Sequence, residues 1–147
     1  MPQHPHSDER NSTWFLIFFA WLIAAASTLG ALFFSEVLAV PPCTLCWYQR
    51  IAMFPLVLIL APALFPLDRG VVRYALPLSV VGLGTAIFHW LLQLGLISPS
   101  ASPCAQGSSC AEVSISWFGW LTIPLLSVLG FALICLLLIA VRIPHRS

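Results

Sequence analysis

Two cysteine pairs supply the reactive chemistry of this chain. Cys43 and Cys46 form a CxxC pair in the run Pro-Pro-Cys-Thr-Leu-Cys-Trp-Tyr-Gln-Arg at positions 41–50. Cys104 and Cys110 form a second pair, with five residues between them. A thiolate can attack a disulfide and take its place in a new one, so two neighbouring pairs can hand electrons to each other. The sequence therefore predicts a dithiol–disulfide relay with these four cysteines as the catalytic residues.

The first pair stands where a polar turn enters an apolar stretch that we expect to be helical. Unsatisfied N–H groups and the dipole at a helix N-terminus favour a thiolate, the reactive form of cysteine. A fixed structural disulfide and half of a metal site are the alternatives for Cys43 and Cys46. We predict no metal site, because the second pair has a different spacing and no histidine lies in its loop.

The remaining cysteines of interest have plainer alternatives. The Cys104–Cys110 pair encloses a short segment of Ala, Gln, Gly and Ser, so a disulfide there is either an accessible redox group or a loop staple. Cys135 lies about 10 Å from the nearer end of its apolar stretch, counted at the rise of an α-helix. We expect it to act as a small hydrophobic side chain and assign it no role.

Arg50 and His89 are the candidate ligand-binding residues. Arg50 follows Cys46 by four positions and so shares its helix face. An arginine inside a membrane span is costly and suggests a function, although snorkelling to the nearby surface is the alternative. His89 lies about 9 Å inside its own stretch, at roughly the depth of Cys46. A ring with two carbonyl oxygens could accept hydrogen bonds from Arg50 and His89 beside that sulfur, which describes a quinone headgroup.

Composition places these residues in a membrane. The 147 residues are 60% hydrophobic and 7% charged, against about 45–50% and about 25% in soluble domains. A membrane-spanning helix needs about 20 apolar residues. We therefore predict an all-α, polytopic membrane protein, a single four-helix bundle over residues 1–147 with two outward loops that carry the cysteine pairs. The predicted spans are 14–34, 47–65, 71–95 and 118–141, with tails at 1–13 and 142–147.

Charge gives the orientation. Five arginines lie in the two tails or flank the 66–70 connection, and they predict that this side is cytoplasmic. They are Arg10, Arg69, Arg73, Arg142 and Arg146. Both cysteine pairs then face outward, which in a bacterium is an oxidising compartment. The net charge of +1 argues against a nucleic-acid partner.

The motifs carry a family resemblance. Residues 42–50, Pro-Cys-Thr-Leu-Cys-Trp-Tyr-Gln-Arg, resemble the signature of the bacterial disulfide bond formation protein B (DsbB) family. Residues 89–93, His-Trp-Leu-Leu-Gln, resemble its third-helix segment. The short Cys104–Cys110 loop, followed by Gly-Trp-Leu-Thr-Ile-Pro at 119–124, resembles the short BdbC-like subfamily. The resemblance covers residues 14–141.

The resemblance implies an activity and a role for each site residue. The protein would reoxidise an extracytoplasmic thioredoxin-fold dithiol oxidase and pass the electrons to ubiquinone or menaquinone in a bacterial cytoplasmic (inner) membrane. Cys104 would be attacked by the partner's thiolate, and Cys110 would then exchange with Cys43. Cys46 would be the thiolate that donates to the quinone, with Arg50 and His89 as its binding residues. The loop pair is closer together than in the longer members of the family, so the separate roles of Cys104 and Cys110 stay open.

Two other functions remain as alternatives at this point. A vitamin K epoxide reductase-like enzyme is also a four-helix bundle with CxxC chemistry, but we expect its CxxC in a late helix rather than at the start of the second. A non-catalytic membrane scaffold would use its disulfides only to brace its loops. A metal transporter is disfavoured because the spans contain no carboxylate to pair with a moving cation.

Overall fold

The computed structural model describes residues 5–39, 41–98, 100, 104, 116–117 and 121–143. Its main elements are α1 (Pro5–Leu32), α2 (Thr44–Leu60), α3 (Val72–Gln93) and α4 (Ile123–Arg142). A π-helical turn, η1 (Phe33–Val37), ends α1, and a 3-10 turn, η2 (Arg69–Val71), leads into α3. The two-residue strands β1 (Ser116–Trp117) and β2 (Leu121–Thr122) pair antiparallel before α4. The predicted all-α four-helix class is confirmed.

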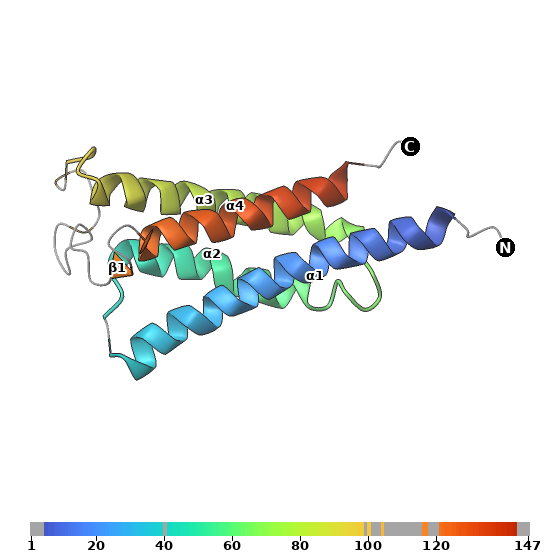
Figure 1. The fold of residues 1–147 in the computed structure, drawn as a ribbon, viewed down its shortest axis with the longest axis horizontal. Coiled ribbons are helices and arrows are strands. Elements are labelled where there is room, and N and C mark those ends of the chain that lie inside the picture. Colours follow the sequence, from blue (N-terminus) through green and yellow to red (C-terminus); the bar gives the residue numbers. More distant parts are fainter. Residues whose placement is uncertain are drawn as a thin grey trace.

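The helices lie alongside one another in a bundle (Figure 1). The start of α1, the α2–α3 connection and the end of α4 lie at one end, and the start of α2 and the end of α3 lie at the other. The N-terminus of α2 carries the CxxC pair, so that second end is where the site is built. We call it the cysteine end.

The second helix is displaced from its predicted bounds of 47–65. It begins earlier, at Thr44, and ends at Leu60, two residues before Pro62, which has no N–H to continue the hydrogen-bond ladder. It has 17 residues. Among the described residues, three other segments are long and apolar enough to cross a membrane by themselves: Ser7–Val37, Arg69–Gln93 and Ile123–Arg142. The earlier start brings Cys46 into the first helical turn.

The first helix also differs from the prediction. Residues 5–13, expected to be a disordered tail, are helical and continue into the apolar part of α1. The Glu9 carboxylate accepts a hydrogen bond from Arg69 at 2.9 Å, and the Thr13 hydroxyl donates to the Glu9 carbonyl at 2.9 Å. The ion pair ties this polar end of α1 to η2, at the end of the bundle opposite the cysteines.

Close packing between α3 and α4 centres on Phe131. This ring is 1% exposed and lies against Gly82, where an added Cβ would overlap the ring atoms. A glycine at this point of α3 therefore gives the ring of α4 its space. The contact fixes how α3, the helix that carries His89, is placed against α4 at its middle.

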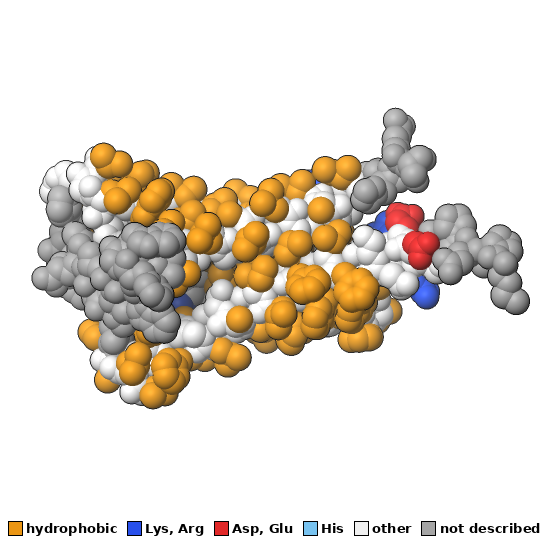
Figure 2. All heavy atoms as spheres, in the orientation of Figure 1, with side chains coloured by type: hydrophobic (Ala, Val, Ile, Leu, Met, Phe, Trp, Pro, Cys, Tyr) orange, Lys and Arg blue, Asp and Glu red, His pale blue; other side chains and the backbone are white. Residues whose placement is uncertain are grey.

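The outer surface of the bundle is apolar. Leu29, Leu58 and Leu136 are 67%, 75% and 63% exposed, and hydrophobic side chains cover the sides of the molecule in Figure 2. Acidic and basic side chains gather at the end opposite the cysteines (Figure 2). Soluble monomers rarely expose apolar surface on this scale. The chain is a multi-pass membrane protein.

Candidate functional site

The CxxC pair forms the N-terminus of α2. Cys43 is the N-cap residue, with an extended backbone, and its Sγ accepts a hydrogen bond from the Cys46 backbone N–H at 3.3 Å. The two Sγ atoms are 2.8 Å apart, and both cysteines are free thiols. Since a disulfide bond is about 2.0 Å long, a small side-chain movement is enough to close or open it. The sulfurs are placed for reversible oxidation.

The surroundings of Cys43 favour its thiolate. The hydrogen bond from the Cys46 side chain is the largest cause of a pKa for Cys43 that is lowered from 9.0 to about 4. Burial raises this pKa, while hydrogen bonds from His89 and from the Cys46 backbone N–H lower it further. Of the two cysteines at the start of the helix, Cys43, the N-cap residue, is therefore the one that favours the thiolate.

His89 reaches the same sulfur from α3. Its Nε2 lies 3.8 Å from Cys43 Sγ, and its Nδ1 lies 3.1 Å from Gln49 Nε2 on α2. An amide nitrogen donates and does not accept, so Nδ1 is the acceptor and the neutral ring carries its proton on Nε2, toward Cys43. Both His89 and Gln49 are buried, at 4% and 7% exposed. In this arrangement Gln49 holds the His89 ring with Nε2 toward the Cys43 sulfur.

Gln49 is the residue of this site that the sequence analysis did not single out. It lies inside the motif at 42–50, between Tyr48 and Arg50, but its role depends on a contact with a different helix. One signal was available in the sequence. A glutamine three positions after Cys46 lies on nearly the same helix face.

Arg50 projects toward α1. Its guanidinium donates to the Ala31 carbonyl oxygen at 2.6 Å and lies over the Trp47 ring, 5.5 Å from the centroid. Ala31 is next to the last residue of α1, where the helix changes to the π-helical turn. Arg50 therefore joins α2 to α1 near the cysteine end. The expectation that Arg50 and His89 bind the same quinone ring stays a prediction.

Cys104 packs next to the CxxC pair. It is disulfide-bonded and 7% exposed, and it belongs to one buried cluster with Cys43, Leu45 and Leu92. Cys104, a member of the second pair, thus belongs to the same buried cluster as Cys43. Cys110, its predicted partner, lies outside the described residues.

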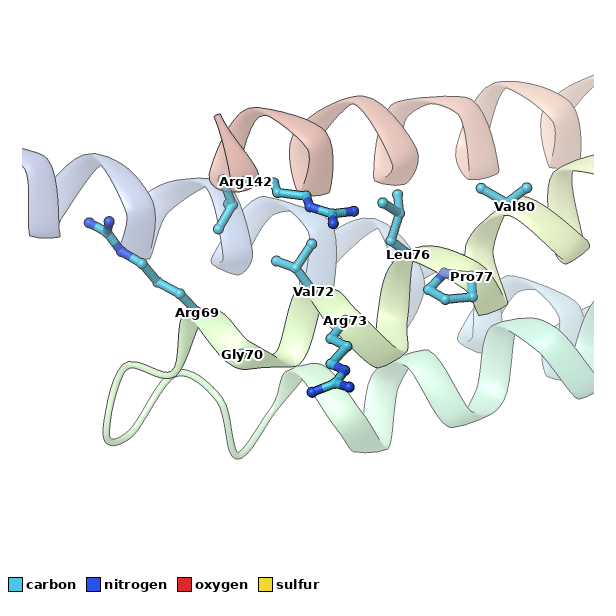
Figure 3. A pocket seen from close by; sticks show the side chains of 9 residues that line it. Arg69, Gly70, Val72, Arg73, Leu76, Pro77, Val80 and Arg142 are labelled. Carbon is cyan, nitrogen blue, oxygen red and sulfur yellow. The ribbon is translucent and has the colours of Figure 1, made fainter. Parts of the chain in front are cut away.

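The remaining features lie away from this cluster. Cys135 is a buried free thiol in α4. A cavity of about 810 Å³ opens at the opposite end of the bundle, between α3 and α4, where the Arg142 side chain extends over Leu76 (Figure 3). Its lining includes Arg69, Arg73 and Arg142 and no cysteine or histidine, so it does not belong to the thiol site.

The chain is similar in sequence to known disulfide formation proteins. The family model described as disulfide bond formation protein DsbB matches residues 10–141. A probable disulfide formation protein of Metapseudomonas resinovorans is 47% identical over 131 residues, which cover 88% of this chain and 91% of the relative. Disulfide bond formation protein C of Bacillus subtilis (strain 168) is 43% identical over 118 residues, which cover 80% and 86%. No solved structure gives a significant match.

The bundle has a thiol pair at the N-terminus of α2, a histidine in contact with it, and a disulfide-bonded cysteine in the same cluster. These features are typical of a membrane protein that carries out thiol–disulfide chemistry. The chain belongs to the DsbB family of disulfide bond formation proteins. The likeness to disulfide bond formation protein C agrees with the short subfamily expected from the sequence. The vitamin K epoxide reductase-like alternative gains no support from these matches.

Proposed function

We propose that the protein is a membrane thiol:quinone oxidoreductase that reoxidises an extracytoplasmic thioredoxin-fold dithiol oxidase. One observation carries the proposal. Cys43 contacts both Cys46 and His89, and Cys43 also shares a buried cluster with the disulfide-bonded Cys104. The cluster offers a stabilised thiolate and a neighbouring disulfide, the two reactants of an exchange.

The relay conserves electrons and protons at each exchange. The partner's dithiol becomes a disulfide and reduces the Cys104–Cys110 bond to two thiols. Those two thiols then become a disulfide again and reduce the Cys43–Cys46 bond in the same way. A quinone bound at the site supplies the final acceptor of two electrons and two protons. The net result is one new disulfide in the partner for each quinone reduced.

The two cysteines of the CxxC pair take different parts. In the reduced pair the two sulfurs lie 2.8 Å apart, and the hydrogen bond between them stabilises a Cys43 thiolate. Once Cys43 is joined to a loop cysteine, that bond is lost and Cys46 is the sulfur released from the original disulfide. We therefore assign exchange with the loop to Cys43 and donation to the quinone to Cys46. His89 Nε2 lies 3.8 Å from the Cys43 sulfur in the reduced pair.

Two residues at the cysteine end support a quinone as the acceptor. The Arg50 guanidinium has five N–H donors, and the bond to Ala31 engages one of its nitrogens. Gln93, one turn after His89 on α3, has a buried Oε1 with no hydrogen-bond partner among the described residues. Arg50 and Gln93 thus offer a donor and an acceptor, which suit a carbonyl and a hydroxyl of the quinone and quinol forms. The choice between ubiquinone and menaquinone is left to experiment.

The proposal includes a place in the cell. The charged end of the bundle, with both described chain ends, faces the cytoplasm of a bacterium, and the cysteine end faces outward from its cytoplasmic (inner) membrane. The disulfide-bonded Cys104 supports an oxidising compartment on that side.

The proposal is tested by following quinone absorbance while the purified protein is mixed with the reduced thioredoxin-fold oxidase of the same organism. We expect oxidised quinone to disappear in step with the partner's thiols. Cys46→Ser should abolish the reaction, because no thiol remains to complete the Cys43–Cys46 disulfide.

Cys135→Ser is the matched control, since it removes a cysteine of the same bundle that lies away from the cluster. It should reduce quinone at the rate of the unchanged protein. An intact, folded protein that leaves the quinone oxidised while its partner stays reduced would contradict the proposal and favour a scaffold with structural disulfides.

A further inference from the structure

We propose that the reduced CxxC pair and His89 together form a binding site for a thiophilic divalent cation, with Zn²⁺ as the representative ion, and that binding arrests the relay. The ligand atoms are Cys43 Sγ, Cys46 Sγ and His89 Nε2. This is a regulatory or inhibitory site in addition to the proposed function, and it uses no quinone and no partner protein.

The geometry of the three atoms suits such an ion. They all lie within 4.8 Å of one another, and Cys43 Sγ is 3.8 Å from His89 Nε2. Tetrahedral zinc with Zn–S bonds of about 2.3 Å places neighbouring sulfur ligands about 3.8 Å apart. The two sulfurs, at 2.8 Å, would open by about 1 Å to admit the ion. A CxxC pair at a helix start allows this movement because Cys43 lies outside the helix.

Gln49 completes the site as an outer partner. A histidine that binds a metal through Nε2 donates its Nδ1–H to a neighbouring acceptor, and this bond orients the ring. Gln49 lies 3.1 Å from Nδ1 and has both an amide nitrogen and an amide oxygen. Rotation of the amide lets the same side chain support the metal-free tautomer through its nitrogen and the metal-bound tautomer through its oxygen.

The three ligand residues are largely buried, which favours a bound ion. Cys43 and His89 are 8% and 4% exposed, and Cys46 is half-buried. Three ligands from two helices surround the ion and leave its fourth position open to water or a further ligand, as in zinc sites with two cysteines and one histidine. A cation held there is shielded from much of the surrounding water.

The site exists only in the reduced protein. Binding leaves both sulfurs as bound thiolates and releases whatever protons they carried, with no change of oxidation state. A disulfide offers neither thiolate, so oxidation of the pair removes two of the three ligands. The bound ion in turn occupies both sulfurs, which can then neither exchange with a loop cysteine nor form their own disulfide.

This inference revises the sequence prediction of no metal site. The loop of the second pair has no histidine, and the third ligand comes instead from α3, 43 positions after Cys46 in the chain. The depth of His89 in α3 matches the N-terminus of α2 only because the two helices pack side by side.

The test measures metal binding directly. Protein with Cys104→Ser and Cys110→Ser, which keeps the CxxC pair and removes the loop thiols, is reduced and titrated with Co²⁺ and then with Zn²⁺. We expect a sulfur-to-cobalt charge-transfer band that Zn²⁺ removes, one ion per protein, and no band with the pair oxidised. Zn²⁺ should also slow alkylation of the pair until a chelator is added.

Variants separate a three-ligand site from simple binding by two thiols. Gln49→Leu keeps every ligand and should weaken Zn²⁺ binding by about 10–100-fold. His89→Phe should weaken it at least as much, and Cys135→Ser should leave it unchanged. Equal affinity in His89→Phe and the parent, or binding by the oxidised pair, would overturn the proposal. Because the titration contains no quinone, failure here is distinct from failure of the oxidoreductase function.

Discussion

At the scale of single residues, three side chains set the reactivity of one sulfur. Cys43 caps α2 and receives hydrogen bonds from Cys46, while His89 presents Nε2 to it from α3. Gln49 acts one step further out by fixing the ring of His89. Each contact favours negative charge on the Cys43 sulfur, and together they outweigh the burial that opposes it.

The pH dependence of alkylation follows from this arrangement. The pKa of Cys43 is lowered to about 4, so the thiolate persists from neutral pH down to that range and is lost as the pH falls through about 4. We expect Cys43 of the reduced protein to react with iodoacetamide at a nearly constant rate between about pH 8 and 5, where an ordinary thiol with a pKa of about 8.5 loses most of its reactivity. Mass spectrometry of the modified peptide gives the rate at each pH.

His89→Phe should move this profile to higher pH, because the ring's hydrogen bond to Cys43 is lost. In that background, Gln49→Leu should cause no further shift, since Gln49 acts through His89. Independent, additive shifts from the two substitutions would show that Gln49 does not work through the histidine.

At the scale of the elements, the site depends on where α3 lies. His89 meets Cys43 because α3 packs against α2 on one side and α4 on the other. The Phe131 ring of α4 fills the space left by Gly82 of α3, seven positions before His89. Packing at the middle of the bundle therefore positions the histidine at its end.

Gly82→Ala tests this packing. The new Cβ would overlap the Phe131 ring, which is 1% exposed and has little room to move. We expect a loss of about 1–3 kcal/mol in the free energy of unfolding, measured from thermal unfolding of the purified protein in one detergent.

Gly84→Ala is the matched control on the same helix, because nothing lies within 4 Å of its added Cβ. It should be neutral or stabilising by up to about 1 kcal/mol, as alanine favours helix over glycine. Similar losses for the two variants would mean that the contact with Phe131 is not what Gly82 provides.

At the scale of the whole molecule, an apolar belt separates two different ends. The charged side chains gather at the end with the α2–α3 connection, while the thiols lie at the opposite end (Figures 1 and 2). A membrane across this belt keeps the CxxC pair on one side and the α2–α3 connection, with Arg69, on the other. The positive-inside rule then predicts which side is which.

Single cysteines introduced at two exposed carboxylates test the orientation, in a background with all five natural cysteines replaced by alanine. Glu36→Cys, beside the cysteine end, should react with a membrane-impermeant maleimide in intact cells. Asp68→Cys, at the α2–α3 connection, should react only after the membrane is permeabilised. The opposite pattern of labelling would reverse the proposed orientation.

The sequence was a reliable guide where local chemistry decides the outcome. Long apolar stretches have to become membrane helices because only helices satisfy their own backbone groups in lipid, and the class was confirmed. Family membership followed from the motif around Cys43 and Cys46. Helix ends were less accurate, since Pro62 ended α2 early and the Glu9–Arg69 pair accompanied an extension of α1 beyond its apolar part.

By itself, the sequence determined a four-helix membrane protein with a CxxC pair at a helix start, a second cysteine pair after the third helix, and His89 and Arg50 at a similar depth. Only the tertiary structure decided which of these meet. It brought His89 to Cys43 with Gln49 behind it, turned Arg50 toward the Ala31 carbonyl, and placed Cys104 in the cluster with Cys43. The physical reason is that contacts between helices depend on the rotation and depth of each helix, which packing such as that of Phe131 on Gly82 determines and no local pattern encodes.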